Sequence, residues 1–224
     1  MGNIIRVDFH VHSIGSPDSL SEGEALYSRA KKLGLGKLVI TDHNHTGTVF
    51  GLQKKHPDYV IAGEEILTTA GEILALFVKK EIPKGIGPLE AFKRLKDQNA
   101  FISLSHPYAY MRHGWTETEM EEFLPYLDAI EISNARNLPE MNLSAARFAS
   151  EHGLCGTAGS DAHGLSELGA MGLSLHDFNS ADELREAIKS AEVFGKESPF
   201  TVRFYSRKAA LLKSIHRKLG IRLY

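Results

Sequence analysis

The sequence predicts an α/β domain in which strands alternate with helices, and three observations support this prediction. The 224 residues are 42% hydrophobic and 24% charged, which is typical of a globular domain and excludes a disordered chain. Seven short apolar runs have the composition of strands, and amphipathic stretches separate most of them. Strands joined by helical crossovers imply a parallel sheet, either covered by helices or closed into a barrel.

The expected strands are short runs bounded by turn residues or by the start of a helix. The third and fourth strands are separated by Ala70 and Gly71, which predicts a hairpin between them. The seven predicted strands are residues 4–12, 37–41, 59–65, 72–78, 100–106, 127–133 and 154–160.

The expected helices begin at recognisable start signals. Three begin at a Ser or Thr followed three residues later by Glu, which is the spacing of a capping box, and two begin at a proline. They are expected from Ser21 (with Glu24) to Lys32, over 46–55, from Pro88 to Gln98, from Thr116 (with Glu119), from Pro139 to about His152, and from Ser180 (with Glu183).

Charge is unevenly distributed between the two parts of the chain. Residues 196–224 contain eight basic residues and one acidic residue, a net charge of +7, whereas the other 195 residues contain 18 basic and 27 acidic residues, a net charge of −9. We therefore expect a domain over 1–195 and a basic extension over 196–224 that packs on it as an amphipathic helix from about Ser206. Contact with nucleic acid or with an anionic membrane surface is the alternative. The apolar stripe of this helix would be Ala210, Leu211, Ile215 and Leu219.

The sequence also predicts a cytoplasmic protein. Its longest strongly apolar run, Ile73 to Val78, is too short to span a membrane, and its first residues lack the features of a signal peptide. The single cysteine, Cys155, cannot form an internal disulfide, which fits a reducing compartment. The oligomeric state is left open.

Side chains that bind metals lie at the ends of five predicted strands. In a parallel barrel these carboxyl ends meet at one face, where active sites are built. Imidazoles and carboxylates without thiolates suit zinc, manganese or iron, and bridging carboxylates permit more than one ion. The strand-end residues are Asp8, His10, His12, Asp42, His43, Glu64, Glu65, His106, Asp161 and His163.

The first of these strands carries the densest signal. His10 and His12 are two residues apart, so their side chains share one face of the strand and can serve one metal. Asp8 shares that face and could orient a ligand. Taken one at a time, each strand end has an ordinary structural explanation, such as a hydrogen-bonded histidine or an Asx turn. The five together favour a metal centre.

Five motifs in this order resemble those of the PHP (polymerase and histidinol phosphatase) superfamily. The motifs are DFHVHS (8–13), ITDHN (40–44), GEE (63–65), SHP (105–107) and GSDAH (159–163), and EISNARN (131–137) resembles a further family segment. The resemblance implies a distorted (β/α)7 barrel, similar to a TIM barrel, and two or three divalent metal ions. It also implies hydrolysis of phosphoesters.

The resemblance further implies the role of each ligand. Glu65 would bridge two ions, while the neighbouring Glu64 would point away. The implied ligands are His10, His12 and Asp161 for the first ion, Glu65 and His106 for the second, and Asp18, His43 and His163 for the third.

The second ion site departs from the family pattern. Leu74 stands in the strand where many relatives have a further histidine, and it cannot bind a metal. Glu72 lies two residues earlier on the same face of that strand, so it could substitute.

The implied reaction is hydrolysis of a phosphate monoester, or of a nucleotide or oligonucleotide end, by a hydroxide that bridges two metals. We expect Asp161, His163 and Arg136 at the reacting phosphate. Both Arg136 and Arg112 follow strand ends and could contact the phosphate, and the alternative for each is a solvated surface arginine. Expected partners are a phosphorylated small molecule or nucleotide, with nucleic acid possible through the basic extension.

Two other functions stay open at this stage. A catalytically weak, metal-dependent binding or regulatory module would fit the incomplete second site. A hydrolase of carbon–nitrogen bonds would also use His-x-His, but such barrels usually add a carboxylated lysine at a strand end, and no core strand here ends in Lys.

Overall fold

A computed structural model describes residues 3–219, which fold around one sheet of nine strands. Arg222 of the basic extension lies outside the described residues. The order within the sheet is β7-β6-β5-β4-β3-β2-β1-β8-β9. The strands are β1 (Ile4–Asp8), β2 (Lys37–Ile40), β3 (Val60–Leu67), β4 (Glu72–Leu76), β5 (Phe101–Leu104), β6 (Ala129–Asn134), β7 (Cys155–Gly159), β8 (Met171–His176) and β9 (Glu192–Gly195).

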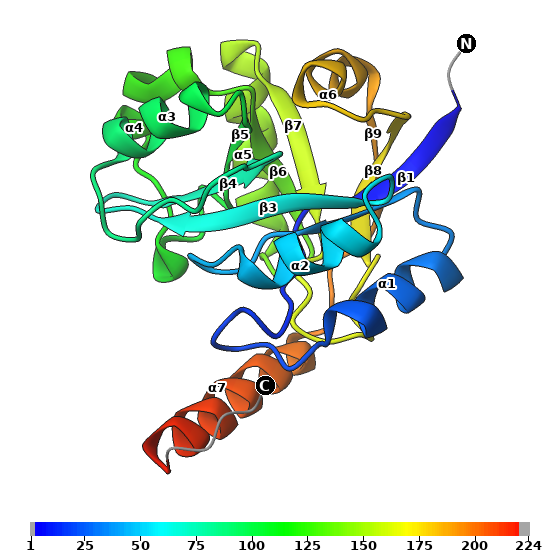
Figure 1. Cartoon of the computed structure of the whole chain (residues 1–224). Helices are drawn as coiled ribbons and strands as arrows, with labels where there is room; N and C mark the ends of the chain where they lie inside the picture. The colour runs from blue at the N-terminus through cyan, green and yellow to red at the C-terminus, as the bar shows by residue number, and fades with distance from the viewer. Residues whose placement is uncertain (1–2, 220–224) are drawn as a thin grey trace.

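The segment that follows β1 closes the first seven strands into a ring. The amide of Phe9 donates to the carbonyl of Ala158 at 3.3 Å, and the amide of His12 donates to that of Ala162 at 2.8 Å. Val11 and Ala162 form a parallel bridge. The α/β barrel of seven strands is therefore confirmed (Figure 1). The sequence analysis missed β8 and β9, which extend the sheet beside the start of β1.

One strand of the ring runs against its neighbours. β4 pairs antiparallel with β3, as the hairpin prediction expected, but it also pairs antiparallel with β5. The expectation that a helical crossover makes the next strand parallel is wrong at this point. Because β3 and β5 run in the common direction and β4 is reversed between them, the first residue of β4, Glu72, lies at the face where the other strands end.

Among the described residues, the first six α-helices along the chain pack around the outside of the ring, and the last one extends away from it (Figure 1). In chain order, the α-helices are α1 (Gly23–Lys32), α2 (Gly47–Lys55), α3 (Pro88–Asp97), α4 (Glu117–Phe123), α5 (Pro139–His152), α6 (Ala181–Ala187) and α7 (Arg203–Lys218). Short 3-10 helices are η1 (Tyr110–Arg112), η2 (Leu124–Tyr126), η3 (Ile188–Ser190) and η4 (Phe200–Val202). Within the described part of the chain, no helix is both long and apolar enough to cross a membrane.

The helix-start signals were partly correct. Thr116 and Glu119 form a reciprocal capping box at α4, as expected. The box expected from Ser21 and Glu24 does not form, because α1 begins at Gly23 and the Glu24 carboxylate contacts basic side chains of α2 instead.

Helix α7 extends away from the barrel at the C-terminal end of the described chain (Figure 1). Its contacts with the barrel are largely polar. Lys213 Nζ donates to the carbonyl oxygens of Ile14 and Ser16, each at 2.5 Å, while Ala209 is buried beside them along the helix. Most of the predicted apolar stripe does not face the barrel, and its large exposed members are Leu211, Ile215 and Leu219.

Trp115 joins two outer helices to the reversed strand. Its fully buried ring lies 6.2 Å from that of Phe92 on α3 and 6.1 Å from that of Phe123 on α4, between centroids. Its Nε1 donates to the carbonyl of Glu72 at 2.9 Å. Trp115 therefore helps to fix the position at which β4 begins.

We expect Trp115→Ala to lower the free energy of unfolding by about 3–5 kcal/mol, because it leaves a large cavity and removes the hydrogen bond from the indole to the carbonyl of Glu72. Denaturant unfolding followed by circular dichroism measures this change. The control is Leu143→Ala on α5, an exposed side chain whose loss should change stability by no more than about 0.5 kcal/mol. Equal losses of unfolding free energy in the two variants would contradict the role of Trp115 in joining the helices to β4.

Candidate metal centre

The strand ends bring imidazole and carboxylate groups together at one mouth of the barrel. The extension of β1 supplies two histidines, the loop between β1 and α1 supplies an aspartate, β3 supplies a glutamate, and the segments after β2, β5 and β7 supply the others. The structure places together all eight residues that the sequence analysis expected to bind metal: His10, His12, Asp18, His43, Glu65, His106, Asp161 and His163.

The first group consists of His10, His12 and Asp161, all fully buried. Asp161 Oδ1 lies 3.3 Å from His12 Nε2 and 3.8 Å from His10 Nε2. One nitrogen or oxygen atom from each of the three residues lies within 4.8 Å of the others. These three side chains are therefore close enough together to hold one ion.

Glu65 lies between this first group and the second group, which consists of His106 and Glu65 itself. Its Oε1 is 3.1 Å from His106 Nε2, and its Oε2 is 2.9 Å from His43 Nδ1. Glu64 faces the other way, where its Oε2 accepts from the amide of Ile82 at 3.0 Å and burial raises its pKa to about 8. Of the two adjacent glutamates, only Glu65 faces the cluster.

Glu72 reaches the same group from the reversed strand. Its Oε2 lies 3.4 Å from His106 Nε2, and its Oε1 lies 3.9 Å from His43 Nδ1. Burial, together with the neighbouring Glu65 carboxylate, raises the pKa of Glu72 to about 8. Leu74 pairs with Glu65 across the hairpin and is fully buried. Glu72 thus lies next to the second group, in which Leu74 stands where many members of the resembled family have a histidine.

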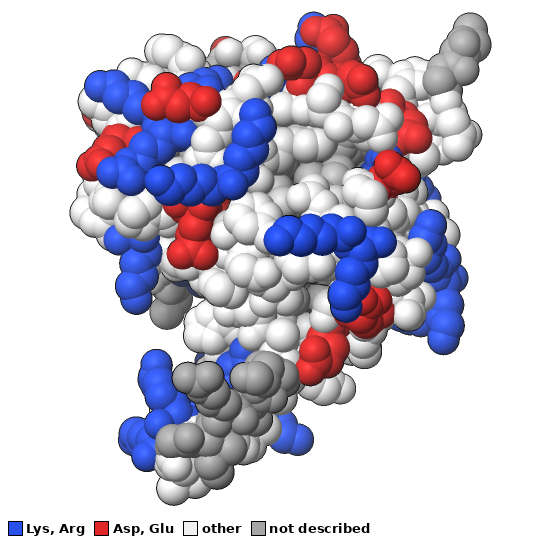
Figure 2. All heavy atoms as spheres, viewed as in Figure 1, with Lys and Arg blue, Asp and Glu red and all other residues white. Residues whose placement is uncertain are grey.

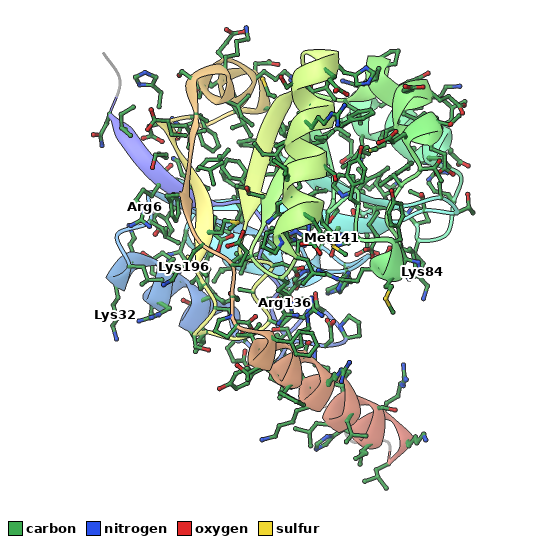
Figure 3. All side chains as sticks on the ribbon, turned by 180° about the vertical axis from the view of Figure 1, so that it is seen from behind. Arg6, Lys32, Lys84, Arg136, Met141 and Lys196 are labelled. Carbon is green, nitrogen blue, oxygen red and sulfur yellow. The ribbon has the colours of Figure 1, made fainter. Side chains whose placement is uncertain are left out.

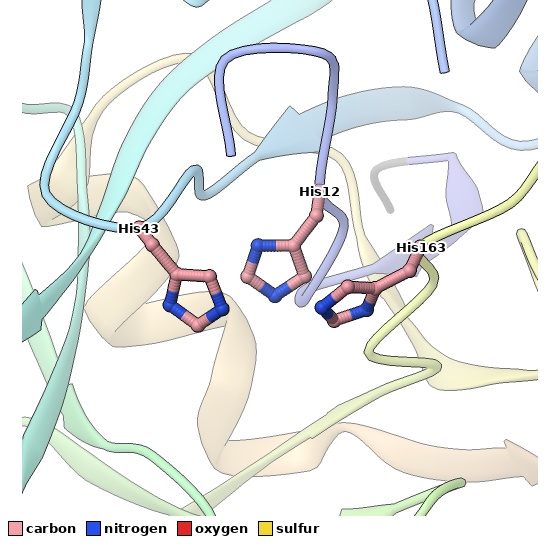
Figure 4. Close-up of side chains that lie close together, drawn as sticks. All are labelled: His12, His43 and His163. Atoms are coloured by element: carbon pink, nitrogen blue, oxygen red, sulfur yellow. The ribbon is translucent and has the colours of Figure 1, made fainter. Parts of the chain in front are cut away.

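The third group lies at the rim. Asp18 Oδ2 is 3.0 Å from His163 Nε2 and 3.7 Å from His43 Nε2. Figure 4 shows the rings of His12, His43 and His163 side by side, and His12 is 4.4 Å from His43 and 4.2 Å from His163 between centroids. His43 therefore borders all three groups.

Many polar atoms of the cluster make no hydrogen bond. A buried polar atom without a partner costs free energy, so such atoms are rare in folded proteins. Those among the described residues of this cluster are His10 Nε2, His12 Nε2, Asp18 Oδ1, Glu65 Oε2, His106 Nδ1, His106 Nε2 and Asp161 Oδ1. Their convergence fits divalent cations bound by nitrogen and oxygen ligands.

The electrostatics of the cluster lead to the same conclusion. Burial opposes a charge on His10, but the surrounding carboxylates, led by Glu65, outweigh burial and raise the pKa of His10 well above its usual value. Burial and the neighbouring imidazoles, led by His163, lower the pKa of His12 well below its usual value. The surroundings thus favour a protonated His10 beside a neutral His12. A bound cation would take the place of the proton among these carboxylates.

Glu131 is the ligand-supporting residue that the sequence analysis missed. Its Oε1 lies 3.0 Å from His10 Nδ1, and its Oε2 accepts from the amide of His106 at 2.8 Å and from Asn134 Nδ2 at 3.0 Å. A carboxylate in this position fixes the tautomer of a histidine ligand. The available signal was an acidic residue between two isoleucines of a strand.

Asp8 has a different role from the one expected. It accepts from the hydroxyl of Ser160 at 2.5 Å and from the amide of Gly169 at 2.9 Å, and burial raises its pKa to about 6 despite these hydrogen bonds. Near the cluster it contacts the amide of His10 at 3.3 Å rather than the imidazole. Asp8 therefore fastens β1 to the chain beyond β7.

The two arginines considered for phosphate binding differ in their surroundings. Arg112 pairs with Asp161, and its side chain is 31% exposed. Arg136 is buried, which excludes the solvated-surface alternative, and it donates to Glu167 from Nε at 2.9 Å and from Nη2 at 2.7 Å. Its Nη1 also donates to Ser206 of α7, at the junction of the barrel and this helix (Figure 3). Both arginines line a cavity of about 560 Å³ above the cluster.

Backbone conformation directs two of the candidate ligands. His106 has a φ of 23° and Asp161 a φ of 54°, in the left-handed region that residues with a side chain rarely adopt. Gly159 ends β7 so close to β1 that a Cβ there would lie 2.4 Å from the Cβ of His10. A tight approach and two sharp turns thus position these side chains.

Comparison with known proteins agrees with the motifs. The PHP_C family model, described as PHP-associated, matches residues 139–193. The uncharacterized protein MJ0417 of Methanocaldococcus jannaschii is 30% identical over 249 aligned positions, covering 97% of this chain and 100% of the relative. The chain belongs to the PHP superfamily.

Solved structures share the fold of this PHP protein. A two-domain protein of Bacteroides vulgatus that contains a predicted PHP-like metal-dependent phosphoesterase has a TM-score of 0.74 at 18% identity, covering 93% of this chain and 70% of its own. The lesion-specific endonuclease EndoQ of Pyrococcus furiosus has a TM-score of 0.62 at 16% identity, covering 85% of this chain and 58% of its own.

We expect Glu65→Gln to weaken metal binding more than about 100-fold, because the variant removes the anionic group shared by neighbouring ligand groups. Glu64→Gln is the matched control and should retain wild-type affinity, since the Gln carbonyl can still accept from Ile82. Isothermal titration with Mn²⁺ or Zn²⁺ measures both. Loss of metal binding in the Glu64 variant alone would show that Glu64, and not Glu65, contributes to the metal site.

We expect Glu131→Gln to weaken metal binding about 10–100-fold without removing a ligand. The glutamine side chain has one accepting oxygen in place of the two of glutamate. It therefore cannot accept both from the backbone amide of His106 and from His10 Nδ1–H, and the His10 ring loses its fixed tautomer. The same titration measures the effect. Unchanged affinity in a folded variant would show that Glu131 does not position His10.

Proposed function

We propose that this PHP protein is a metal-dependent phosphoesterase whose substrate is a phosphate monoester or the end of a nucleotide or oligonucleotide. One observation carries the proposal, namely the convergence of buried nitrogen and oxygen atoms without hydrogen bonds beneath an accessible cavity. The structural neighbours named as PHP-like phosphoesterases support the same general activity.

The cluster would hold two or three divalent ions, of zinc, manganese or iron. When bound, such ions neutralise phosphate oxygens and lower the pKa of water enough to supply a nucleophile near neutral pH. The residues proposed to hold them are His10, His12, Asp18, His43, Glu65, His106, Asp161 and His163, with Glu72 added beside His106.

Arg112 is the side chain best placed to bind the substrate phosphate. It pairs with Asp161 at the floor of the cavity, and its partial exposure allows its guanidinium to bind an incoming anion. Because a phosphate and Asp161 would both accept from this guanidinium, Arg112 would orient the phosphorus next to the ligand cluster.

Arg136 would support the site from behind. Its hydrogen bonds to Glu167 occupy Nε and Nη2, and Glu167 Oε1 in turn accepts from the amide of His163 at 3.3 Å. This chain of contacts holds the His163 backbone, and His163 and Asp18 face the cavity, where a phosphate oxygen or leaving oxygen would lie.

A metal-dependent binding or regulatory module is the competing proposal. It draws on Leu74, which replaces a family histidine beside the second group. The position of Glu72, 3.4 Å from His106, favours the enzyme because it supplies a carboxylate to that group.

We expect the purified protein to hydrolyse a chromogenic phosphate monoester, to lose this activity in a chelator, and to regain it with Mn²⁺, Zn²⁺ or Fe²⁺. The double variant His10→Ala with His12→Ala should lose activity and metal together, because both imidazoles of the first group are removed. Phosphate release and elemental analysis measure the two properties. Retained metal binding without turnover of monoesters, mononucleotides or short RNA would favour the binding module.

A further inference from the structure

The cavity above the metal centre is lined by more arginine than one phosphate requires. Besides Arg112 and Arg136, its wall contains Arg203 and Arg207 from the first turns of α7. Arg203 Nη2 donates to the carbonyl of Arg136 at 2.7 Å, which fixes the start of the helix beside the cavity. Guanidinium groups bind phosphates well, so this wall is suited to an anion larger than a single phosphate group.

A second cavity continues along the same helix. It measures about 420 Å³, and it shares Pro17 and Ala210 with the first, so the two adjoin. Its helical wall adds Lys213 and Arg217, and its other wall is the loop 15–17. Lys213 is engaged by carbonyls of the barrel, whereas Arg217 is exposed.

The basic residues in this groove follow the repeat of the helix. Arg203, Arg207, Ala210 and Arg217 are three, four or seven residues apart, so they share one face. At 1.5 Å per residue, Arg207 and Arg217 are about 15 Å apart along the axis, beyond the reach of one phosphate monoester held at the metal centre. Residues 203–218 contain no acidic residue, and basic side chains gather on α7 in Figure 2.

We propose that the groove between α7 and the loop 15–17 binds single-stranded nucleic acid, with one end of the strand at the metal centre. The position of that end rests on the function proposed above. Repeated phosphates would contact Arg207 and Arg217 in turn. Each cavity has the volume of a small-molecule site, which accommodates nucleotide units of one strand rather than a duplex.

An anionic membrane is the other surface that a basic amphipathic helix can bind. The exposed apolar residues Phe204, Leu211 and Ile215 lie on a different face of α7 from the groove. The arginines of the groove, by contrast, line a recess that continues into the metal centre, where a flat bilayer surface does not reach. Their placement favours a strand that enters the recess.

Fluorescence anisotropy with short labelled single-stranded RNA and DNA tests the groove, using the full-length protein in a chelator so that no strand is hydrolysed. We expect Arg207→Glu with Arg217→Glu to weaken binding at least about tenfold and to reduce the slope of log affinity against log salt by about 1.4, roughly 0.7 for each contact with a phosphate of a single strand. The matched control is Lys208→Glu with Lys218→Glu. It changes charge equally on the same helix but outside the groove, and should bind nearly as the wild type does.

Three results would overturn the proposal that this groove binds single-stranded nucleic acid. They are equal losses of affinity in both double variants, no binding by the wild type, or binding to phosphatidylserine vesicles but not to oligonucleotides. Circular dichroism confirms that the variants fold. Hydrolysis of the chromogenic monoester by the metal-loaded wild type is measured separately, so a failure of the proposed function is distinguished from a failure of the groove.

Discussion

Buried charge at the mouth of the barrel is the constraint on which the rest of the structure depends. Removing an ionised side chain from water costs several kcal/mol unless partners compensate. The cluster contains five fully buried candidate ligands, His10, His12, Glu65, His106 and Asp161, and the contacts around them limit that cost. Glu131 holds one imidazole and Arg112 pairs with one carboxylate, while other buried nitrogen and oxygen atoms of the cluster stay without a hydrogen bond. The left-handed backbone at His106 and Asp161 and the close approach of Gly159 to His10 hold the side chains in this arrangement.

Most of the candidate ligands can be predicted because they belong to strand ends. A strand fixes the face on which alternate residues lie, so the spacing of His10 and His12 by itself predicts that they act together. The parallel barrel then predicts that distant strand ends converge. The same reasoning locates Glu65 and His106, although the choice between two adjacent glutamates comes from the family resemblance. The structure agrees with that choice, because Glu64 is turned toward the amide of Ile82.

The residues that were missed or misjudged depend on contacts that no local pattern encodes. The reversal of β4 brings Glu72 to the ligand face, and the sequence reveals the hairpin but not the antiparallel pairing with β5. Glu131 lies in a strand whose residues gave no separate reason to expect contact with His10. The contacts of α7 with the barrel could not be predicted either, because hydrogen bonds from Lys213 and Arg203 to backbone carbonyls hold the helix there. Long-range polar contacts of this kind are set by the tertiary fold.

The left-handed backbone at His106 and Asp161 has a consequence for engineering this fold. Each such residue carries roughly 1 kcal/mol of conformational strain, which glycine would relieve. Selection for heat resistance alone would therefore favour glycine at both positions, and each substitution would delete a side chain from the centre. Thermostability and the candidate metal site thus compete at the same two backbone positions, so a library screened only for melting temperature would enrich stable barrels that lack these two side chains.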